Sequence, residues 1–196
     1  MLALVGNDVV DLGDSEIAEH HARERFVARV CCDEERARLA VAASPKRYLW
    51  TLFAAKEAAY KVARKIHGDA IFAHRRFVVA EDLRSVRWGD LELALRVEAD
   101  DARVHAVTST EPAPAIAAVA AIWRNEPPST AGRTLLREAL ARAHDCTPDE
   151  IEVARTELPD SWDGFGPPRV LLRGAPIARD VSLSHDGRFV AFAASR

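Results

Sequence analysis

The sequence is short of the features that define several large classes of protein. It has no run of about 18 apolar residues, so it predicts no membrane-spanning helix. Its formal net charge is only -3, and its basic residues are interspersed with acidic ones, which argues against a nucleic-acid-binding surface. The N-terminal residues lack the charged and apolar segments of a signal peptide, so we expect none. A glycine-rich P-loop is also absent, which disfavours a P-loop phosphotransferase.

Cysteine is scarce as well. The three cysteines are the neighbours Cys31 and Cys32 and the distant Cys146, and no C-x-x-C pattern occurs. An odd number of cysteines without a spaced framework favours free thiols in a reducing compartment. We therefore expect a cytoplasmic protein whose cysteines hold no metal.

The chain does contain enough apolar residues for a substantial core. Of its 196 residues 48% are apolar, which suits one large core or two small ones packed together. Residues 1–12 read as a strand, and the acid-rich residues that follow Val30 begin a short helix. Ser44 and Pro45 are typical of a helix start, and that helix is expected to end near His67 and Gly68. Strands are then predicted at 71–80, 91–99, 102–109 and 115–123.

The segment RNEPPST, residues 124–130, is the best candidate for a boundary because it holds two prolines and no apolar residue. A helix at 130–143 and a capping-box-like turn at 147–150 follow it. Strands are expected at 151–156 and 169–174, and an Asp-Gly hairpin within 180–194. Because the order helix-then-strands occurs twice, we predict an α+β fold of two related halves, 1–126 and 127–196, packed as a pseudo-dimer.

Three charged residues stand in apolar surroundings. Glu57 and Lys61 are four residues apart and share one face of the predicted helix, where one reading is an ordinary surface ion pair. That helix is too apolar to be mostly exposed, so both side chains are expected to need partners at its rim. Asp8, in the strand VGNDVVDL, raises the same need, because a carboxylate in an apolar strand costs free energy unless it is paired.

Asp8 and Glu57 can meet this need in one site. Two carboxylates from separate elements, with no histidine or cysteine close in sequence, suit Mg²⁺, which also binds water and substrate phosphate. A lysine one helical turn away would face the same phosphates. The pattern is compatible with phosphoryl transfer, in which a metal ion and a lysine neutralise charge on the transferred group.

Three stretches resemble the signature blocks of the 4′-phosphopantetheinyl transferases. They are VGNDVVDL, FAAKEAAYK at 53–61 and DVSLSHDGRFVAFA at the C-terminus. Their order, together with RFVARVCCDEERARL at 25–39, resembles that of the small holo-acyl-carrier-protein synthases. The chain is longer than those proteins, and its residues from 131 onward resemble the N-terminal half of the larger, surfactin-type enzymes. The resemblance thus implies a two-half transferase with the halves in the opposite order, as after circular permutation.

The resemblance implies a reaction and a set of site residues. Such enzymes transfer 4′-phosphopantetheine from coenzyme A to a serine of an apo acyl or peptidyl carrier protein and release 3′,5′-ADP. Asp8 and Glu57 match the Mg²⁺ ligands, and Lys61 matches the lysine beside the pyrophosphate. Two candidates remain for the base that deprotonates the serine, namely Glu57 and a water molecule held by the metal.

Four further residues match positions that contact coenzyme A. Arg133 and Thr134 correspond to a pair near its phosphates, and Ser184 and His185 to the S-H pair, with His185 near the 3′-phosphate. An arginine suits a phosphate because its guanidinium group binds two oxygens at once.

The chain also departs from the family pattern. Where the larger enzymes have an acid two residues after the first metal ligand, this chain has Val10. Asp11 matches an acid of the small synthases and is a candidate to reach the metal directly or through water; the alternative is that a water molecule fills that metal position. The lysine of a G-K-P block is replaced in Gly166-Pro167-Pro168, for which Arg169 is a candidate substitute.

Other readings stay open at this point. One is a weakened relative that binds coenzyme A or carrier protein without catalysis, and another is a different Mg²⁺-dependent phosphotransferase. Because carrier proteins are acidic, Arg23, Arg25, Arg29 and Arg47 are candidates for a docking face. A monomer is expected, since both halves lie in one chain, and the carrier protein of fatty-acid, polyketide or nonribosomal peptide synthesis is left undetermined.

Overall fold

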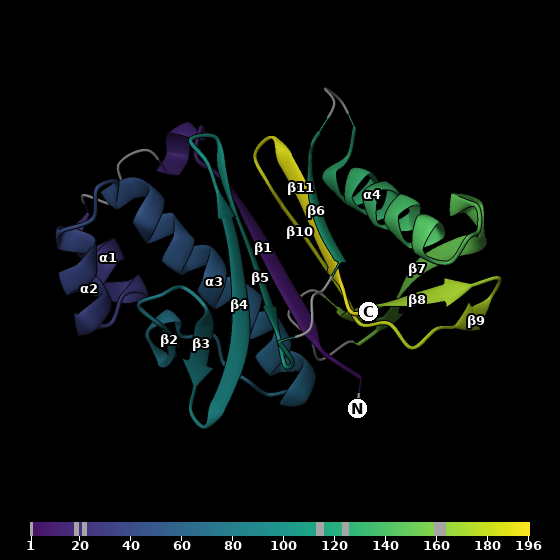
Figure 1. Ribbon diagram of the computed structural model, residues 1–196, viewed down its shortest axis with the longest axis horizontal. Coiled ribbons are helices and arrows are strands. Elements are labelled where there is room, and N and C mark those ends of the chain that lie inside the picture. Colours follow the sequence, from purple (N-terminus) through teal and green to yellow (C-terminus); the bar gives the residue numbers. More distant parts are fainter. Residues whose placement is uncertain (1, 18–19, 21–22, 113–115, 123–125, 159–163) are drawn as a thin grey trace.

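The first half of the molecule is a five-stranded sheet with a long helix on one face (Figure 1). The computed structural model describes residues 2–17, 20, 23–112, 116–122, 126–158 and 164–196. In order along the chain, the elements of this half are β1 (Val5–Asp11), η1 (Ser15–Ile17), α1 (Glu24–Val30), α2 (Asp33–Ala40), α3 (Pro45–Ile66), η3 (His74–Arg76), β2 (Phe77–Val79), β3 (Ser85–Trp88), β4 (Leu91–Ala99) and β5 (Arg103–Ser109).

The second half is smaller and is also built from one principal helix and strands. Its elements are β6 (Ile116–Ala121), α4 (Pro128–Ala143), η4 (Pro148–Glu150), β7 (Ile151–Glu157), β8 (Phe165–Leu172), β9 (Ala175–Pro176), β10 (Val181–Asp186) and β11 (Phe189–Ala194). They form two small antiparallel sheets, ordered β10-β11-β6 and β7-β8-β9, and β8 contacts β10.

The strand order of the second half repeats that of the first. The first sheet has the order β1-β5-β4-β3-β2. In the second half, β6 is equivalent to β1, β11 to β5 and β10 to β4, and these strands have the same order. Helix α4 is equivalent to α3. The predicted α+β fold of two related halves is therefore confirmed. The boundary at 126 stays a prediction; β6, which precedes it in the sequence, pairs with β11 of the second sheet.

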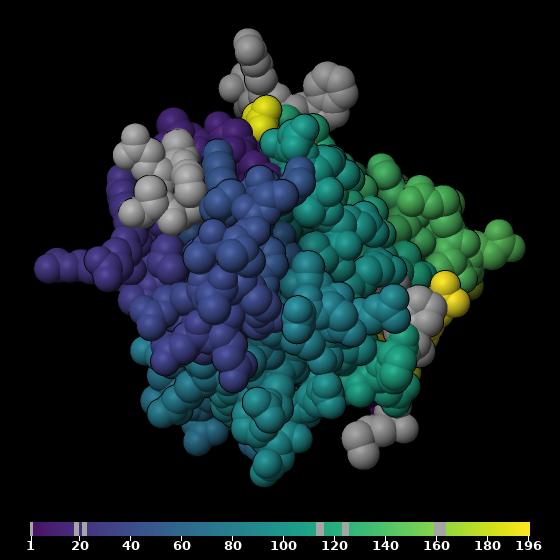
Figure 2. Space-filling view, turned by 60° about the vertical axis from the view of Figure 1, so that its left-hand side comes forward, coloured from purple at the N-terminus to yellow at the C-terminus, as the bar shows by residue number. Residues whose placement is uncertain are grey.

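The two sheets lie face to face between the two helices, in the order α3, first sheet, second sheet, α4 (Figure 1). One core cluster joins α3 to the first sheet, and another joins α4 to β10 and β11. Smaller clusters lie between the sheets, where Val5 packs near Ala193 and Val9 near Phe189. Figure 2 looks onto the first half, with α4 visible at its edge. The inter-sheet contact is therefore where residues of the two halves meet.

Helix α3 is fixed against β1 by close packing. Proline at its first turn and an alanine-rich sequence favour the helix, and Ala54, Ala58 and Val62 are fully buried against the sheet. A Cβ atom built on Gly6 would lie 2.0 Å from the carbonyl oxygen of Ala58, so the helix approaches the strand too closely for any other residue at position 6. This contact sets the position of Glu57, the residue before Ala58, relative to β1.

Alternation along β1 separates its two acids. Gly6 and Val10 face α3, whereas Val5 and Val9 face the second half. Asp8 shares the face of Gly6, and Asp11 shares the face of Val9. The two carboxylates that look equivalent in the sequence therefore point to opposite sides of the strand.

Most other predictions about local structure agree with the structure. The helix predicted from Pro45 is present, although the Ser44 side chain forms no capping hydrogen bond. The capping box at Thr147 is present. Strand β3 was not predicted, and part of the RNEPPST segment lies outside the described residues. All three cysteines are free, and among the described residues no helix is long and apolar enough to span a membrane.

Candidate active site

Asp8 and Lys61 form an ion pair at the junction of β1 and α3. Lys61 Nζ donates to Asp8 Oδ1 at 3.0 Å and to the backbone carbonyl of Asn7 at 2.7 Å. The two side chains are only partly exposed, 30% for Lys61 and 15% for Asp8. Burial raises the pKa of Asp8 above its ordinary value, and the charge and hydrogen bond of Lys61 and the charge of His185 oppose that rise.

Glu57 lies one helical turn before Lys61 and close to Asp8. Burial, followed by the charge of Asp8, raises the pKa of Glu57 to about 7, and the charge of Lys61 partly opposes this rise. His74 Nε2 is 3.9 Å from Glu57 Oε1, but burial lowers the pKa of His74 to about 4, so the ring is neutral at pH 7. Glu57 thus has no cationic partner of its own among these neighbours.

These two carboxylates fit a magnesium ion. Lys61 supplies one positive charge to a half-buried site that holds two carboxyl groups, and the pKa of each carboxyl group is raised. A divalent cation would remove that excess of negative charge. Within the described part of the chain no three His, Cys, Asp or Glu side chains form a metal-binding cluster. Two carboxylates are a donor set that Mg²⁺ accepts, since it completes its shell with water or phosphate oxygens.

Ser184 and His185 lie on β10, next to this site across the contact between the halves. Asn7 Nδ2 donates to Ser184 Oγ at 2.9 Å, and the charge of His185 is one of the contributions that oppose the rise in the pKa of Asp8. His185 is exposed and Ser184 is partly buried. The structure thus brings Asp8, Glu57, Lys61 and the predicted S-H pair together at one edge of β1.

Comparison with known proteins shows which family the chain belongs to. The sequence profile of the 4′-phosphopantetheinyl transferase superfamily matches residues 4–120, which is more than half of the chain. The chain belongs to this superfamily. A solved structure that it resembles is holo-acyl-carrier-protein synthase from Neisseria meningitidis, with 20% sequence identity, a TM-score of 0.41, and coverage of 54% of this chain and 94% of that one. No curated protein matches the chain significantly.

Two residues of this phosphopantetheinyl transferase that were expected to contact coenzyme A, Arg133 and Thr134, are not part of the cluster of site residues around Asp8. Arg133 Nη1 donates to the carbonyl of Ser129 at 3.4 Å in its own helix, and Thr134 is exposed. Their helix nevertheless lies over β10, because Gly132 is close to Leu183. Arg169, the candidate substitute for the missing lysine, is exposed on β8. These three residues stay predictions.

Asp11 has a different partner from the one expected. Arg188 binds it with Nε at 2.8 Å and Nη2 at 2.6 Å, and the backbone N–H groups of Arg188 and Gly13 also donate to it. Hydrogen bonds from Arg188 lower the pKa of Asp11 to about 2, and its side chain is 2% exposed. Both oxygens are thus occupied on the face away from Asp8. Position 10, where the larger enzymes have an acid, is the apolar Val10, which is buried in the core beside α3. The carboxylate of Asp11 is already paired, so neither position adds a free carboxylate to the site.

Asn7 also joins the halves at this site, and no sequence pattern indicated it. Asn7 is fully buried, its N–H donates to Ser182 Oγ at 3.0 Å, and its side chain reaches Ser184 and His105 Nε2. Its Oδ1 atom has no hydrogen-bond partner among the described residues. An asparagine in a strand carries no signal of this kind, because its partners lie 98 and 177 residues away.

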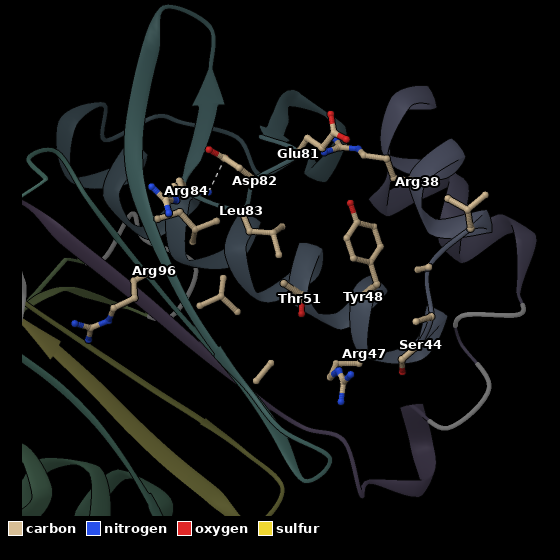
Figure 3. A pocket seen from close by; sticks show the side chains of 16 residues that line it. Arg38, Ser44, Arg47, Tyr48, Thr51, Glu81, Asp82, Leu83, Arg84 and Arg96 are labelled. Carbon is tan, nitrogen blue, oxygen red and sulfur yellow. Dashed lines mark hydrogen bonds between the residues drawn. The ribbon is translucent and has the colours of Figure 1, made fainter.

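The predicted docking arginines are divided between two surface cavities. Arg23, Arg25 and Arg29 line one of about 590 Å³ beside Phe26 at the start of α1. Arg47 lines another of about 840 Å³, between the start of α3 and β4, and is paired with Asp101 at 3.0 Å. Figure 3 shows the second cavity, which none of the predicted catalytic or metal-binding residues lines.

Proposed function

We propose that this superfamily member transfers the 4′-phosphopantetheine group of coenzyme A to a serine hydroxyl of an apo acyl or peptidyl carrier protein. The observation that carries the proposal is the meeting of Asp8, Glu57 and Lys61 beside the β10 strand of His185. A site with two carboxylates, a lysine and an adjacent histidine suits a pyrophosphate substrate, whose charge needs cations on several sides.

The chain's own side chains have distinct tasks in this reaction. The serine oxygen forms a bond to the β-phosphorus of coenzyme A, and the bond from that phosphorus to the oxygen of 3′,5′-ADP breaks. In this proposal Glu57, or a water molecule held by the metal, accepts the serine proton, and Lys61 stabilises or protonates the departing oxygen. His185 and Arg133 are candidates to hold the phosphates of the nucleotide portion.

Asp8 and Glu57 are the residues that would hold magnesium. When bound, the ion supplies charge neutralisation for the pyrophosphate. The pairing of Asp11 with Arg188 leaves Asp11 as a supporting residue in this proposal, since both of its oxygens already accept hydrogen bonds.

Incubation with coenzyme A, Mg²⁺ and several apo carrier proteins tests the proposal. Intact mass spectrometry should detect the gain of one phosphopantetheinyl group on a carrier protein, together with 3′,5′-ADP. Glu57→Gln should lower the rate at least a hundredfold, because it removes both a metal ligand and the candidate proton acceptor. The matched control is Glu34→Gln, an exposed glutamate on α2, which should retain the rate.

The outcomes separate the proposal from its alternative. If no carrier protein gains mass while the folded protein binds coenzyme A, the non-catalytic relative is the better description. If Glu57→Gln keeps a rate within a few-fold of the unchanged protein, the assignment of Glu57 is wrong.

A further inference from the structure

β1 and β10 run side by side across the contact between the halves (Figure 1), but they are joined through side chains. The N–H groups of Val5, Asn7 and Asp11 donate to Asp180 Oδ2 at 2.6 Å, Ser182 Oγ at 3.0 Å and Asp186 Oδ2 at 2.7 Å. Each pair is 175 residues apart in sequence, so the strands run parallel in a constant register. We call this row of three contacts the seam.

Lys65 closes one end of the seam. It lies one helical turn beyond Lys61 on α3, and its Nζ donates to three acceptors. These are the carbonyl of Val5 at 2.7 Å, the carbonyl of Val181 at 2.8 Å and Asp180 Oδ2 at 2.8 Å. The side chains of Lys65 and Asp180 are only 9% and 11% exposed. One ammonium group thus ties together α3, β1 and β10.

The position of this contact relates the two parts of the proposed site. On the first half, Glu57, Lys61 and Lys65 lie on the same face of α3, each about one helical turn after the one before. On the second half, Ser184 and His185 follow Asp180 by four and five residues along β10. A slip of β10 along β1 would move the S-H pair past Asp8 by about 3.3 Å per residue.

We propose that the Lys65–Asp180 pair is a positioning device that sets the register of the coenzyme-binding strand β10 against the catalytic residues of β1 and α3. This inference rests on the proposed function for its kinetic consequence. All three acceptors of Lys65 belong to Val5, Asp180 and Val181, and none is a proposed reacting group. Lys65 therefore acts through the alignment of the halves, whereas Lys61, which contacts Asp8, faces the reaction itself.

Kinetics and amide exchange of Lys65→Met and Asp180→Asn test the device. Methionine keeps most of the length of the lysine side chain without its charge, and asparagine keeps an oxygen for the Val5 N–H. Each variant should raise KM for coenzyme A at least tenfold and leave KM for the carrier protein within about twofold. The double variant should be no worse than the more impaired single variant, because both changes break the same pair. Lys65→Arg should restore much of the affinity.

The control is Lys56→Met, which breaks a buried ion pair on the same helix, with Glu35 of the first half. It should lower stability without changing KM for coenzyme A at temperatures where the protein is folded. An unchanged KM in Lys65→Met, or an equal rise in Lys56→Met, would overturn the positioning role.

A second readout does not depend on activity. By NMR-detected hydrogen exchange, the amides of Val5, Asn7 and Asp11 should exchange faster in Lys65→Met than in Lys56→Met. If the unchanged protein transfers nothing, the proposed function fails, and the seam is then judged by exchange alone. Equal protection of these amides in Lys65→Met and the unchanged protein would refute the device itself.

Discussion

Gly6→Ala is the change that most directly links the packing of this protein to its chemistry. The added Cβ would lie 2.0 Å from the carbonyl oxygen of Ala58, 3.0 Å from its carbonyl carbon and 3.1 Å from Val62 Cγ2. Ordinary contact begins at 3.4 Å, so α3 or β1 must retreat by about 1.4 Å. The nearest atoms belong to the backbone of a buried helix, which cannot turn aside as a flexible side chain can. We expect a loss of about 1–3 kcal/mol in the free energy of unfolding.

The same displacement separates the proposed catalytic residues. Glu57 and Lys61 lie on α3 and Asp8 lies on β1, so a shift between these elements widens the site by a similar distance. Misplacement of reacting groups by about 1 Å costs on the order of a hundredfold in rate. Urea denaturation and the carrier-protein transfer assay, run below the unfolding transition, measure the two effects separately. Gly68→Ala is the control, because its added Cβ meets no atom within 4 Å. A Gly6→Ala protein with transfer within threefold of the unchanged rate would refute the argument.

Two further predictions concern buried charge. Lys56→Met should cost about 3–5 kcal/mol by urea denaturation, because it leaves Glu35 buried without its 2.5 Å partner, and adding Glu35→Gln should recover part of that loss. Burial lowers the pKa of His105 to about 4, so the unfolded chain binds more protons between pH 6.5 and 4, and stability should fall by up to about 3 kcal/mol as the pH falls through that range. His105→Gln should make the dependence of unfolding free energy on pH shallower by one proton; an unchanged slope would contradict it.

Local patterns were sufficient to predict much of the fold. The proline at position 45 and the apolar residues of α3 marked the longest helix, and the Asp-Gly turn marked the hairpin of β10 and β11. Strand β3 was not predicted, because its four residues, Ser85–Trp88, are too few to show a clear alternation of apolar and polar residues. The pairing of β6 with β11 was not predicted, because strand partners are set by tertiary packing and the sequence of an apolar strand does not specify them.

The site shows the same division between local and distant information. The spacing of Glu57 and Lys61 placed them on one helical face, and Lys61 indeed meets Asp8. The pairing of Asp11 with Arg188 depends on a hairpin 177 residues away, and the seam on contacts 175 residues apart. Such partners become neighbours only when the two halves pack together, so no spacing rule within one element predicts them.

The repeated topology also explains why one site, and not two, is expected from two similar halves. In the first half, β1 presents Asp8 to α3, where Glu57 and Lys61 follow at one-turn spacing. The strand in the equivalent place of the second half, β6, contains only isoleucine, alanine and valine, and its helix α4 has Glu138 as its single acid, which is exposed. The second half therefore lacks the paired carboxylates that a magnesium ion needs. What it contributes instead is β10, whose polar face meets β1 and whose S-H pair reaches the site of the other half. In the proposed function the two halves have the same architecture but unlike tasks, and the contact between them matters to catalysis because each task is incomplete on its own side.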